Sequence, residues 1–127
     1  MKISILRTNE CSDLRSRLDY AVKETRHFLE QYTTAIVSET EVQSCGTNKA
    51  DAIVSLFIDE TMEAHHYALQ GDGQSLKISG GNASSVLCGL FEALAEAGIL
   101  FEATGYSVCN RFDLHTFLSV NSYSNAS

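Results

Sequence analysis

A single helical stripe near the N-terminus constrains the fold of this sequence more than any other feature. Between residues 14 and 32, apolar side chains recur at spacings of three and four, while the opposite face is charged. A helix over 13–32 with one apolar side must bury that side against a second layer. Ser12 is the expected N-cap. The stripe consists of Leu14, Leu18, Ala21, Val22, Phe28, Leu29 and Tyr32, with Thr25 filling its gap.

Short β-type segments surround this helix. Residues 2–6 alternate polar and apolar, and residues 34–38 are β-branched. Residues 52–58 are nearly all apolar, which is typical of a central strand covered on both faces. Two further alternating runs, 64–69 and 75–79, lie on either side of an Asp-Gly turn and predict a β-hairpin.

A second helix is predicted over about 83–97. Gly80 and Gly81 break the preceding strand, Asn82 or Ser84 is the expected cap, and Gly98 is the expected residue after the helix. A short strand is expected at 99–101. The expected buried stripe is Val86, Leu87, Leu90, Phe91, Leu94 and Ala95, with Cys88 as a small buried residue among them and Glu92 on the opposite face.

These elements predict an α/β (α+β) domain with the order β-α-β-β-β-β-α-β. Two amphipathic helices are expected on one face of a mixed sheet of five or six strands. Residues 1–118 are predicted to form one domain, and the polar segment 119–127 is predicted to be a frayed tail.

The charge balance narrows the classes of partner. The chain has 127 residues, with 9 Lys and Arg against 16 Asp and Glu, and a net charge of -7. Nucleic acid and anionic membrane are therefore not expected as partners. The sequence also has no membrane-spanning run and no secretory signal. The location stays open between the cytoplasm and, if a signal peptide has been removed, the periplasm or the outside of the cell.

Charged and reactive residues do not form a recognisable catalytic or metal site. Asp59, Glu60 and Glu63 are predicted to be a solvated loop, although paired carboxylates can perform glycosidic acid–base work. On a strand, His65 and His66 point to opposite faces, so they cannot ligate one ion together.

The remaining nucleophiles and glycines have simpler explanations. Cys109 and His115 lack an orienting group, and the Ser84-Ser85 pair is better explained by helix capping. The glycines match no phosphate-binding loop. The four cysteines have no CxxC spacing, and either a Cys11–Cys45 or a Cys45–Cys109 disulfide remains open. We therefore predict no catalytic, cofactor-binding or metal-ligating residue.

Residues 63–105 form a recurring pattern of two strands, a helix and a closing strand. Its characteristic positions are Tyr67, Leu69, Leu76, Ile78, Gly80, Asn82, Leu87, Gly89, Phe91, Leu94, Gly98, Ile99 and Phe101. This pattern resembles the N-terminal α/β accessory domain that precedes the barrel in family 20 β-N-acetylhexosaminidases and family 67 α-glucuronidases. Ser85 departs from the resemblance, because the family pattern often has Gly there.

The resemblance implies a non-catalytic structural domain. Its expected partners are the catalytic barrel of the same or a longer chain and carbohydrate, and its expected location is periplasmic or extracellular. No active-site residue carries over, because the catalytic acids of such enzymes lie in the barrel. The alternative is a stand-alone protein-binding or oligomerisation module that uses an exposed sheet face or edge.

Overall fold

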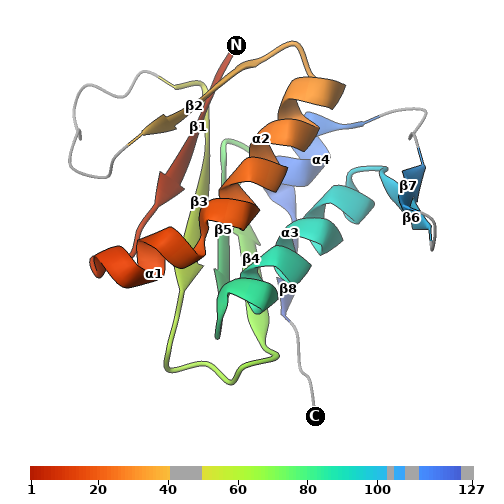
Figure 1. Ribbon diagram of the computed structural model, residues 1–127. Helices are drawn as coiled ribbons and strands as arrows, with labels where there is room; N and C mark the ends of the chain where they lie inside the picture. Colours follow the sequence, from red (N-terminus) through yellow and green to blue (C-terminus); the bar gives the residue numbers. More distant parts are fainter. Residues whose placement is uncertain (41–49, 103–104, 108–111, 124–127) are drawn as a thin grey trace.

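The fold is an α/β domain built on a six-stranded mixed sheet (Figure 1). The computed structural model describes residues 1–40, 50–102, 105–107 and 112–123. The strands lie in the order β2-β1-β3-β5-β4-β8; β1, β2, β3 and β5 are parallel, and β4 and β8 are antiparallel to their neighbours. The strands of this sheet are β1 (Lys2–Arg7), β2 (Ile36–Thr40), β3 (Ala52–Ile58), β4 (Tyr67–Gly71), β5 (Ser75–Gly80) and β8 (Asn121–Tyr123).

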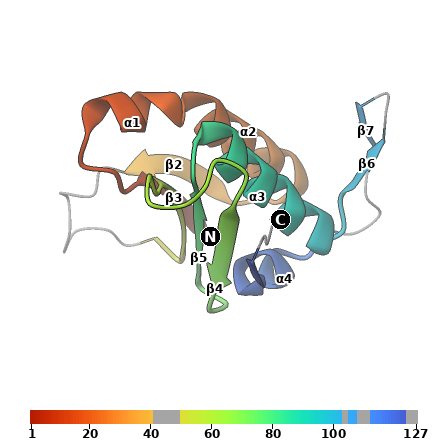
Figure 2. The ribbon, with the colours of Figure 1, turned by 90° about the horizontal axis from the view of Figure 1, so that it is seen from below.

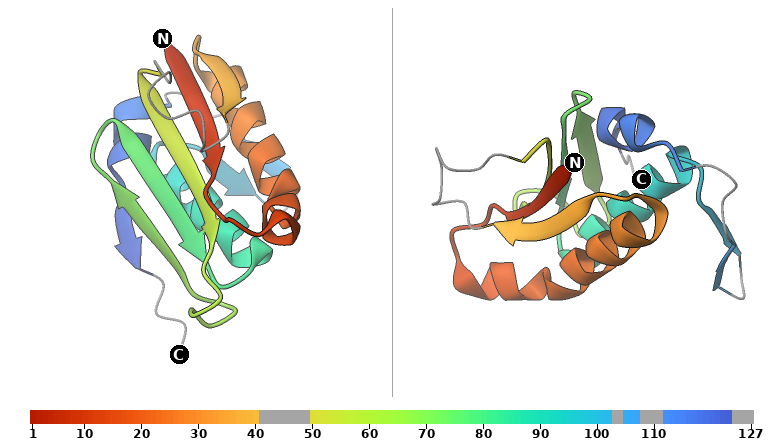
Figure 3. Two further views of the ribbon diagram at one scale, coloured as in Figure 1. Left: turned by 90° about the vertical axis from the view of Figure 1, so that its left-hand side faces the viewer. Right: turned by 90° about the horizontal axis from the view of Figure 1, so that it is seen from above.

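Two long helices cover one face of this sheet, as predicted. They are α2 (Asp19–Tyr32) and α3 (Ala83–Glu96), and Figure 2 shows both in a layer above the strands. They touch through Phe28 and Phe91, whose ring centroids lie 6.4 Å apart. The opposite face, turned toward the viewer at the left of Figure 3, is covered by no helix among the described residues.

The N-terminal helix begins one residue earlier than predicted and is interrupted once. Cys11, not Ser12, is its N-cap, and α1 (Ser12–Arg17) ends before α2 begins. The break is Leu18, with φ -87° and ψ 1°, whose amide donates to the Arg15 carbonyl. Its side chain is completely buried, and the predicted stripe is otherwise buried or half-buried against the core. The periodicity therefore identified the buried side but not the break.

The five strands predicted between residues 2 and 79 are all present, as β1 to β5, and the structure differs from the prediction in three details. The segments expected at 34–38 and 64–69 form strands two or three residues later, at Ile36–Thr40 and Tyr67–Gly71. The third strand matches its predicted bounds, but its residues alternate between buried and half-buried. Coverage of β3 on both faces was therefore a wrong prediction, because both long helices lie on the same side.

The second helix has the predicted ends. The Asn82 side chain accepts from the Ser85 amide at 2.9 Å, so Asn82 is the N-cap. At the other end, Gly98 has φ +116°, and the Gly98 and Ile99 amides donate to the carbonyls of Ala95 and Leu94. This is the bond pattern of a Schellman C-cap, which favours glycine in the left-handed region.

The buried stripe of α3 is rotated relative to the prediction. Ala95 and Cys88 are exposed, and Leu87 and Phe91 are only half-buried. The reason is Gly89: a Cβ there would lie 3.1 Å from Ile78 Cγ2, so the helix turns its smallest residue toward the sheet. The residues that face the sheet are Val86, Gly89, Leu90, Ala93 and Leu94.

The C-terminal part contains elements that the sequence did not predict. The strand expected at 99–101 is β6 (Leu100–Glu102), which pairs with β7 (Gly105–Ser107) in a separate two-stranded ribbon. Then α4 (Leu114–Ser119) packs beside the β4–β5 turn, where the Gly73 amide donates to the Leu118 carbonyl at 2.9 Å.

The predicted frayed tail was wrong for three of its residues. Although 119–127 is small and polar, Asn121–Tyr123 forms β8 and pairs with β4. The Asn121 side chain adds bonds to the amide and carbonyl of Gly71, so a polar segment gains its order from the hairpin beside it. Residues 124–127 lie outside the described residues.

Candidate functional site

The carboxyl ends of the parallel strands are the usual ligand site in an open α/β sheet. At this edge the side chain of Asn9, which follows β1, is bonded to the last residue of β3. Its Nδ2 donates to the Ile58 carbonyl and its Oδ1 accepts from the Ile58 amide, both at 2.8 Å. Asn9 is only 5% exposed. No local sequence pattern could have revealed this cross-strand role.

The loop between β3 and β4 closes the next part of the same edge. A Cβ at Gly81 would collide with the carbonyl of Glu63, and the Gly81 amide donates to the His66 carbonyl at 3.1 Å. The Ser85 hydroxyl donates to the Ala64 carbonyl. The predicted end of the strand at Gly80-Gly81 is therefore confirmed, and Gly81 has no room for a side chain because another backbone segment lies close to it.

The charged residues of that loop do not converge. Asp59 Oδ1 accepts from the Thr61 hydroxyl and amide, and these bonds hold the pKa of Asp59 below its usual value. His66 Nε2 lies 3.8 Å from Glu63 Oε2, while His65 is exposed in the turn before β4. Among the described residues, no three His, Cys, Asp or Glu side chains form a group that could hold a metal ion.

The other predicted candidates are separated or lie outside the described residues. Cys45 and Cys109 are outside them, so neither the proposed disulfides nor the Cys109–His115 pair is tested. Cys11 and Cys88 are free thiols at the surface. Cys88 was expected to be buried; it is exposed because the rotation of α3 places Gly89, rather than Cys88, against the sheet.

A Tyr–Glu pair joins α3 to β4 and was not predicted. Burial, followed by a hydrogen bond with Glu92 and its charge, raises the pKa of Tyr67 to about 12. Glu92 was expected on the solvent side, but its Oε2 is buried without a hydrogen-bond partner. Tyr67 Cδ1 would lie 3.2 Å from a Cβ at Gly89, so the unusual glycine was the signal that could have located this contact.

The outer side of α3 carries almost no charge. Its charged residues are Glu92, which has one carboxylate oxygen buried, and Glu96, which is exposed in the last turn. The residues on this side are three exposed small side chains and two half-buried large apolar ones. We call this surface the α3 outer face; it consists of Ser84, Leu87, Cys88, Phe91 and Ala95.

The side of the sheet opposite the helices differs from the α3 outer face, because it combines polar, apolar and basic side chains. Its strand positions mix serine with half-buried apolar residues such as Ile53 and Phe57. Lys77 Nζ lies 5.6 Å from the centroid of the Phe57 ring. No carboxylate occupies an open-side position of the described strands, although the chain contains 16 acidic residues. We call this surface the open sheet face.

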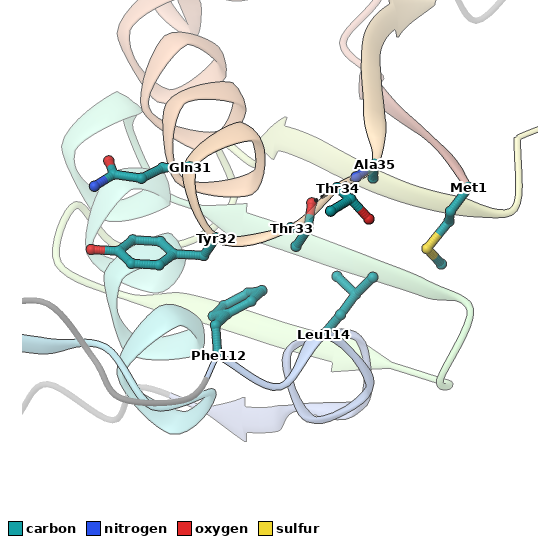
Figure 4. A pocket seen from close by; sticks show the side chains of 8 residues that line it. All are labelled: Met1, Gln31, Tyr32, Thr33, Thr34, Ala35, Phe112 and Leu114. Atoms are coloured by element: carbon teal, nitrogen blue, oxygen red, sulfur yellow. Dashed lines mark hydrogen bonds between the residues drawn. The ribbon is translucent and has the colours of Figure 1, made fainter.

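A groove of about 500 Å³ lies between the C-terminal end of α2 and the start of α4 (Figure 4). Phe112 and Leu114 form one side, and the segment from Tyr32 to Ala35 forms the other. The Tyr32 and Phe112 ring centroids are 6.2 Å apart. The lining is Met1, Gln31, Tyr32, Thr33, Thr34, Ala35, Phe112 and Leu114, without an ionisable carboxylate, lysine, arginine or histidine.

Comparison with known proteins adds no assignment: no family model matches the chain, and no curated protein matches it significantly. Within the described ranges, none of the helices is long and apolar enough to span a bilayer.

Proposed function

We propose that this protein is a non-catalytic accessory domain that packs against the catalytic barrel of a glycoside hydrolase and helps to shape its substrate cleft. The pattern in residues 63–105, which resembles the N-terminal domains of family 20 and family 67 enzymes, suggests the class. Glycines of that pattern have physical roles here: Gly89 lies against the sheet and Gly98 caps a helix. The barrel belongs to the same chain or to a longer form of it.

The α3 outer face is the observation that carries this proposal. A helix in contact with water on one side normally exposes charged residues there, and a helix that is apolar all round is normally covered. The helix α3 has Cys88 and Ala95 where solvent-facing charges are usual. A neighbouring domain that covered this face would complete the burial of Leu87 and Phe91.

The filled edge of the sheet supports a structural role. Asn9 and the 59–66 loop occupy the region where an α/β enzyme would hold its ligand. Their bonds go to backbone groups of neighbouring strands and turns. These residues therefore stabilise connections of the fold.

The proposal is tested by placing a charge on the α3 outer face within the whole enzyme. Ala95→Lys should weaken the contact with the barrel and lower the melting temperature or activity of the full-length protein. Lys23→Ala, an exposed position on α2, is the matched control and should change neither. The 127-residue chain alone should not cleave aryl hexosaminides or glucuronides. An Ala95→Lys enzyme that matches the parent in both stability and activity would contradict the proposal.

The open sheet face favours the alternative, a stand-alone binding or oligomerisation module. It is free of carboxylates in a chain of net charge -7, so an acidic partner would meet no like charge there. The β2 edge is less suitable, because Arg26 Nη2 donates to the Val37 carbonyl and occupies it. Phe57→Glu should abolish self-association under this alternative; a chain that is monomeric at high concentration would argue against oligomerisation.

A further inference from the structure

The α3 outer face has the spacing of a helix-packing seam. Members of this face recur at intervals of four, three and four positions, at Ser84, Cys88, Phe91 and Ala95. A mean interval near 3.5 keeps such residues in one narrow line along a helix, as in a coiled coil. We call this line the α3 seam. It runs along nearly the whole of α3, which lies in the front layer of Figure 1.

The sizes of the seam side chains suit a second helix. Ser84, Cys88 and Ala95 are small and exposed, so another backbone can approach α3 closely at both ends of the seam. Phe91 is half-buried and is positioned by Phe28 of α2, with ring centroids 6.4 Å apart. A helix packed at about 20° to α3 places a hole over Phe91 and its own side chains over the small residues. A β-sheet is wider, and it would also cover Glu92 and bury its charge.

The charges of α3 are all negative. The helix contains no lysine or arginine, and its charged residues are Glu92 and Glu96, one turn apart. Glu92 Oε2 is buried without a hydrogen-bond partner. The C-terminal end of α3, where both glutamates lie, also carries the negative end of the helix dipole. A partner that pairs with this helix therefore needs basic side chains beside its own apolar line.

We propose that the α3 outer face binds one amphipathic helix that carries lysine or arginine on its flanks. The apolar line of that helix packs into the α3 seam, and its basic side chains pair with Glu92 and Glu96. The helical form and the charge of the partner are inferred from α3 itself. Only the place of that helix, in the outer ring of helices of a catalytic barrel, rests on the function proposed above.

The test is an NMR titration of the ¹⁵N-labelled 127-residue chain with synthetic peptides of about three heptads. The lysine peptide has leucine and alanine at intervals of three and four, with lysine on both flanks. The glutamate peptide has glutamate in place of each lysine, and the alternating peptide has the residues of the lysine peptide in a strand-type order. The lysine peptide should cause saturable shifts at the amides of Ser84, Cys88 and Ala95. The other two should bind at least about tenfold more weakly, because one opposes like charges and the other lacks the helical line.

Two variants and a control locate the contact on the chain. Ala95→Lys places a cation in the seam and should weaken binding of the lysine peptide at least about tenfold. Glu96→Gln removes one charge at an exposed position, where folding is not at risk, and should weaken it about twofold to fivefold. Tyr123→Ala removes an aromatic ring that is 73% exposed on β8 and should change nothing.

Several outcomes would overturn the inference. Equal binding of the lysine and glutamate peptides would reject a basic partner, and equal binding of the alternating peptide would reject a helix. Shifts confined to other surfaces, or no saturable shift with any peptide, would reject the seam as a helix site. Self-association of the chain through the same amides would make a second copy the occupant. Failure of this test would leave the contact with a barrel standing, because a loop of the barrel can cover α3 without a basic helix.

Discussion

The helices α2 and α3 cover the same face of the sheet but present opposite surfaces outward. Both have 14 residues, and both bury apolar side chains against the same core. On its outer side, α2 exposes charged and polar groups, whereas the exposed residues of α3 are Ser84, Cys88, Ala95 and, in its last turn, Glu96. The exposed residues of α2 are Asp19, Tyr20, Lys23, Arg26, His27, Glu30 and Gln31.

This difference separates two requirements that are often met together. Burial of the inner side is enough to hold a helix on a sheet, and both helices satisfy it. A charged outer side is needed only where water is the permanent neighbour. The comparison is therefore the basis of our proposal that α3, unlike α2, lies against a neighbouring domain.

The largest expected effects test whether the buried sides of α2 and α3 contribute equally to the stability of the domain. Leu29 on α2 and Leu90 on α3 are both completely buried. Leu29→Ala and Leu90→Ala should each destabilise the domain by about 2–5 kcal/mol, because each leaves a cavity in one shared core. Urea melts of the two variants measure this. A cost several times larger for one helix would show that the two do not share a core equally.

Gly89→Leu tests the close approach that is peculiar to α3. A Cβ at this position already meets Ile78, Tyr67 and Leu69 at 3.1–3.3 Å, so a larger side chain overpacks the contact. The expected cost is about 1–3 kcal/mol, despite the better helix propensity of leucine. Gly89→Ala should cost less, since a single Cβ needs only small adjustments. A Gly89→Leu domain more stable than the parent in urea would refute the contact.

Each helix also takes part in a tyrosine–glutamate pair, within α2 for Tyr20 and Glu24 and between β4 and α3 for Tyr67 and Glu92, and salt should distinguish the two pairs. The charge of Glu24 is the main cause that raises the pKa of Tyr20, an exposed side chain. Burial is the main cause that raises the pKa of Tyr67 to about 12. At about 1 M salt, where the Debye length is about 3 Å, the Tyr20 shift should largely vanish and most of the Tyr67 shift should remain.

NMR of ring-labelled tyrosines measures both titrations. Because the folded-state pKa of Tyr67 lies above the ordinary value of 10.0, its contribution to stability is complete below pH 10 and is lost as the pH rises through about 12. Glu92→Gln should lower the pKa of Tyr67 only in part, since burial remains. A pKa of Tyr67 that returned to 10 in this variant would mean that charge, not burial, dominates.

The smallest expected effects concern the outer sides in the isolated domain. Lys23→Ala on α2 and Ala95→Lys on α3 should each change stability by less than about 0.5 kcal/mol, because both side chains are in water there. Parallel thermal and urea melts provide the measurement. A large loss from Ala95→Lys in the isolated chain would place Ala95 in a contact within the domain and weaken the interface interpretation.

The elements that could be predicted from sequence are those with a periodic or capping signal. The stripe of the first helix, the β3 run, the hairpin at Asp72-Gly73, the Asn82 cap and the Gly98 cap all depend on neighbours close in sequence. These signals were sufficient for the fold class. They were also sufficient for the side of the sheet that the helices cover.

The features that could not be predicted depend on contacts between distant segments. Asn9 bonds to a strand 49 positions later, and Asn121 orders β8 by bonding to Gly71. The rotation of α3 depends on the space above Ile78 and Tyr67, which shifted the expected stripe and misplaced Cys88 and Glu92. The groove combines the end of one helix with the start of another, so no single segment contains its pattern.

The most direct test of the central claim is the reactivity of two thiols. Cys88 lies on the α3 outer face and Cys11 precedes α1, and both are exposed in the domain. Alkylation by iodoacetamide, followed by peptide mass mapping, is compared between the 127-residue chain and a longer form that carries the proposed barrel domain. The account predicts that Cys88 reacts at least about tenfold more slowly in the longer form, as expected for a covered thiol, while Cys11 keeps its rate. Equal rates for Cys88 in both proteins would contradict the claim that α3 forms an interface.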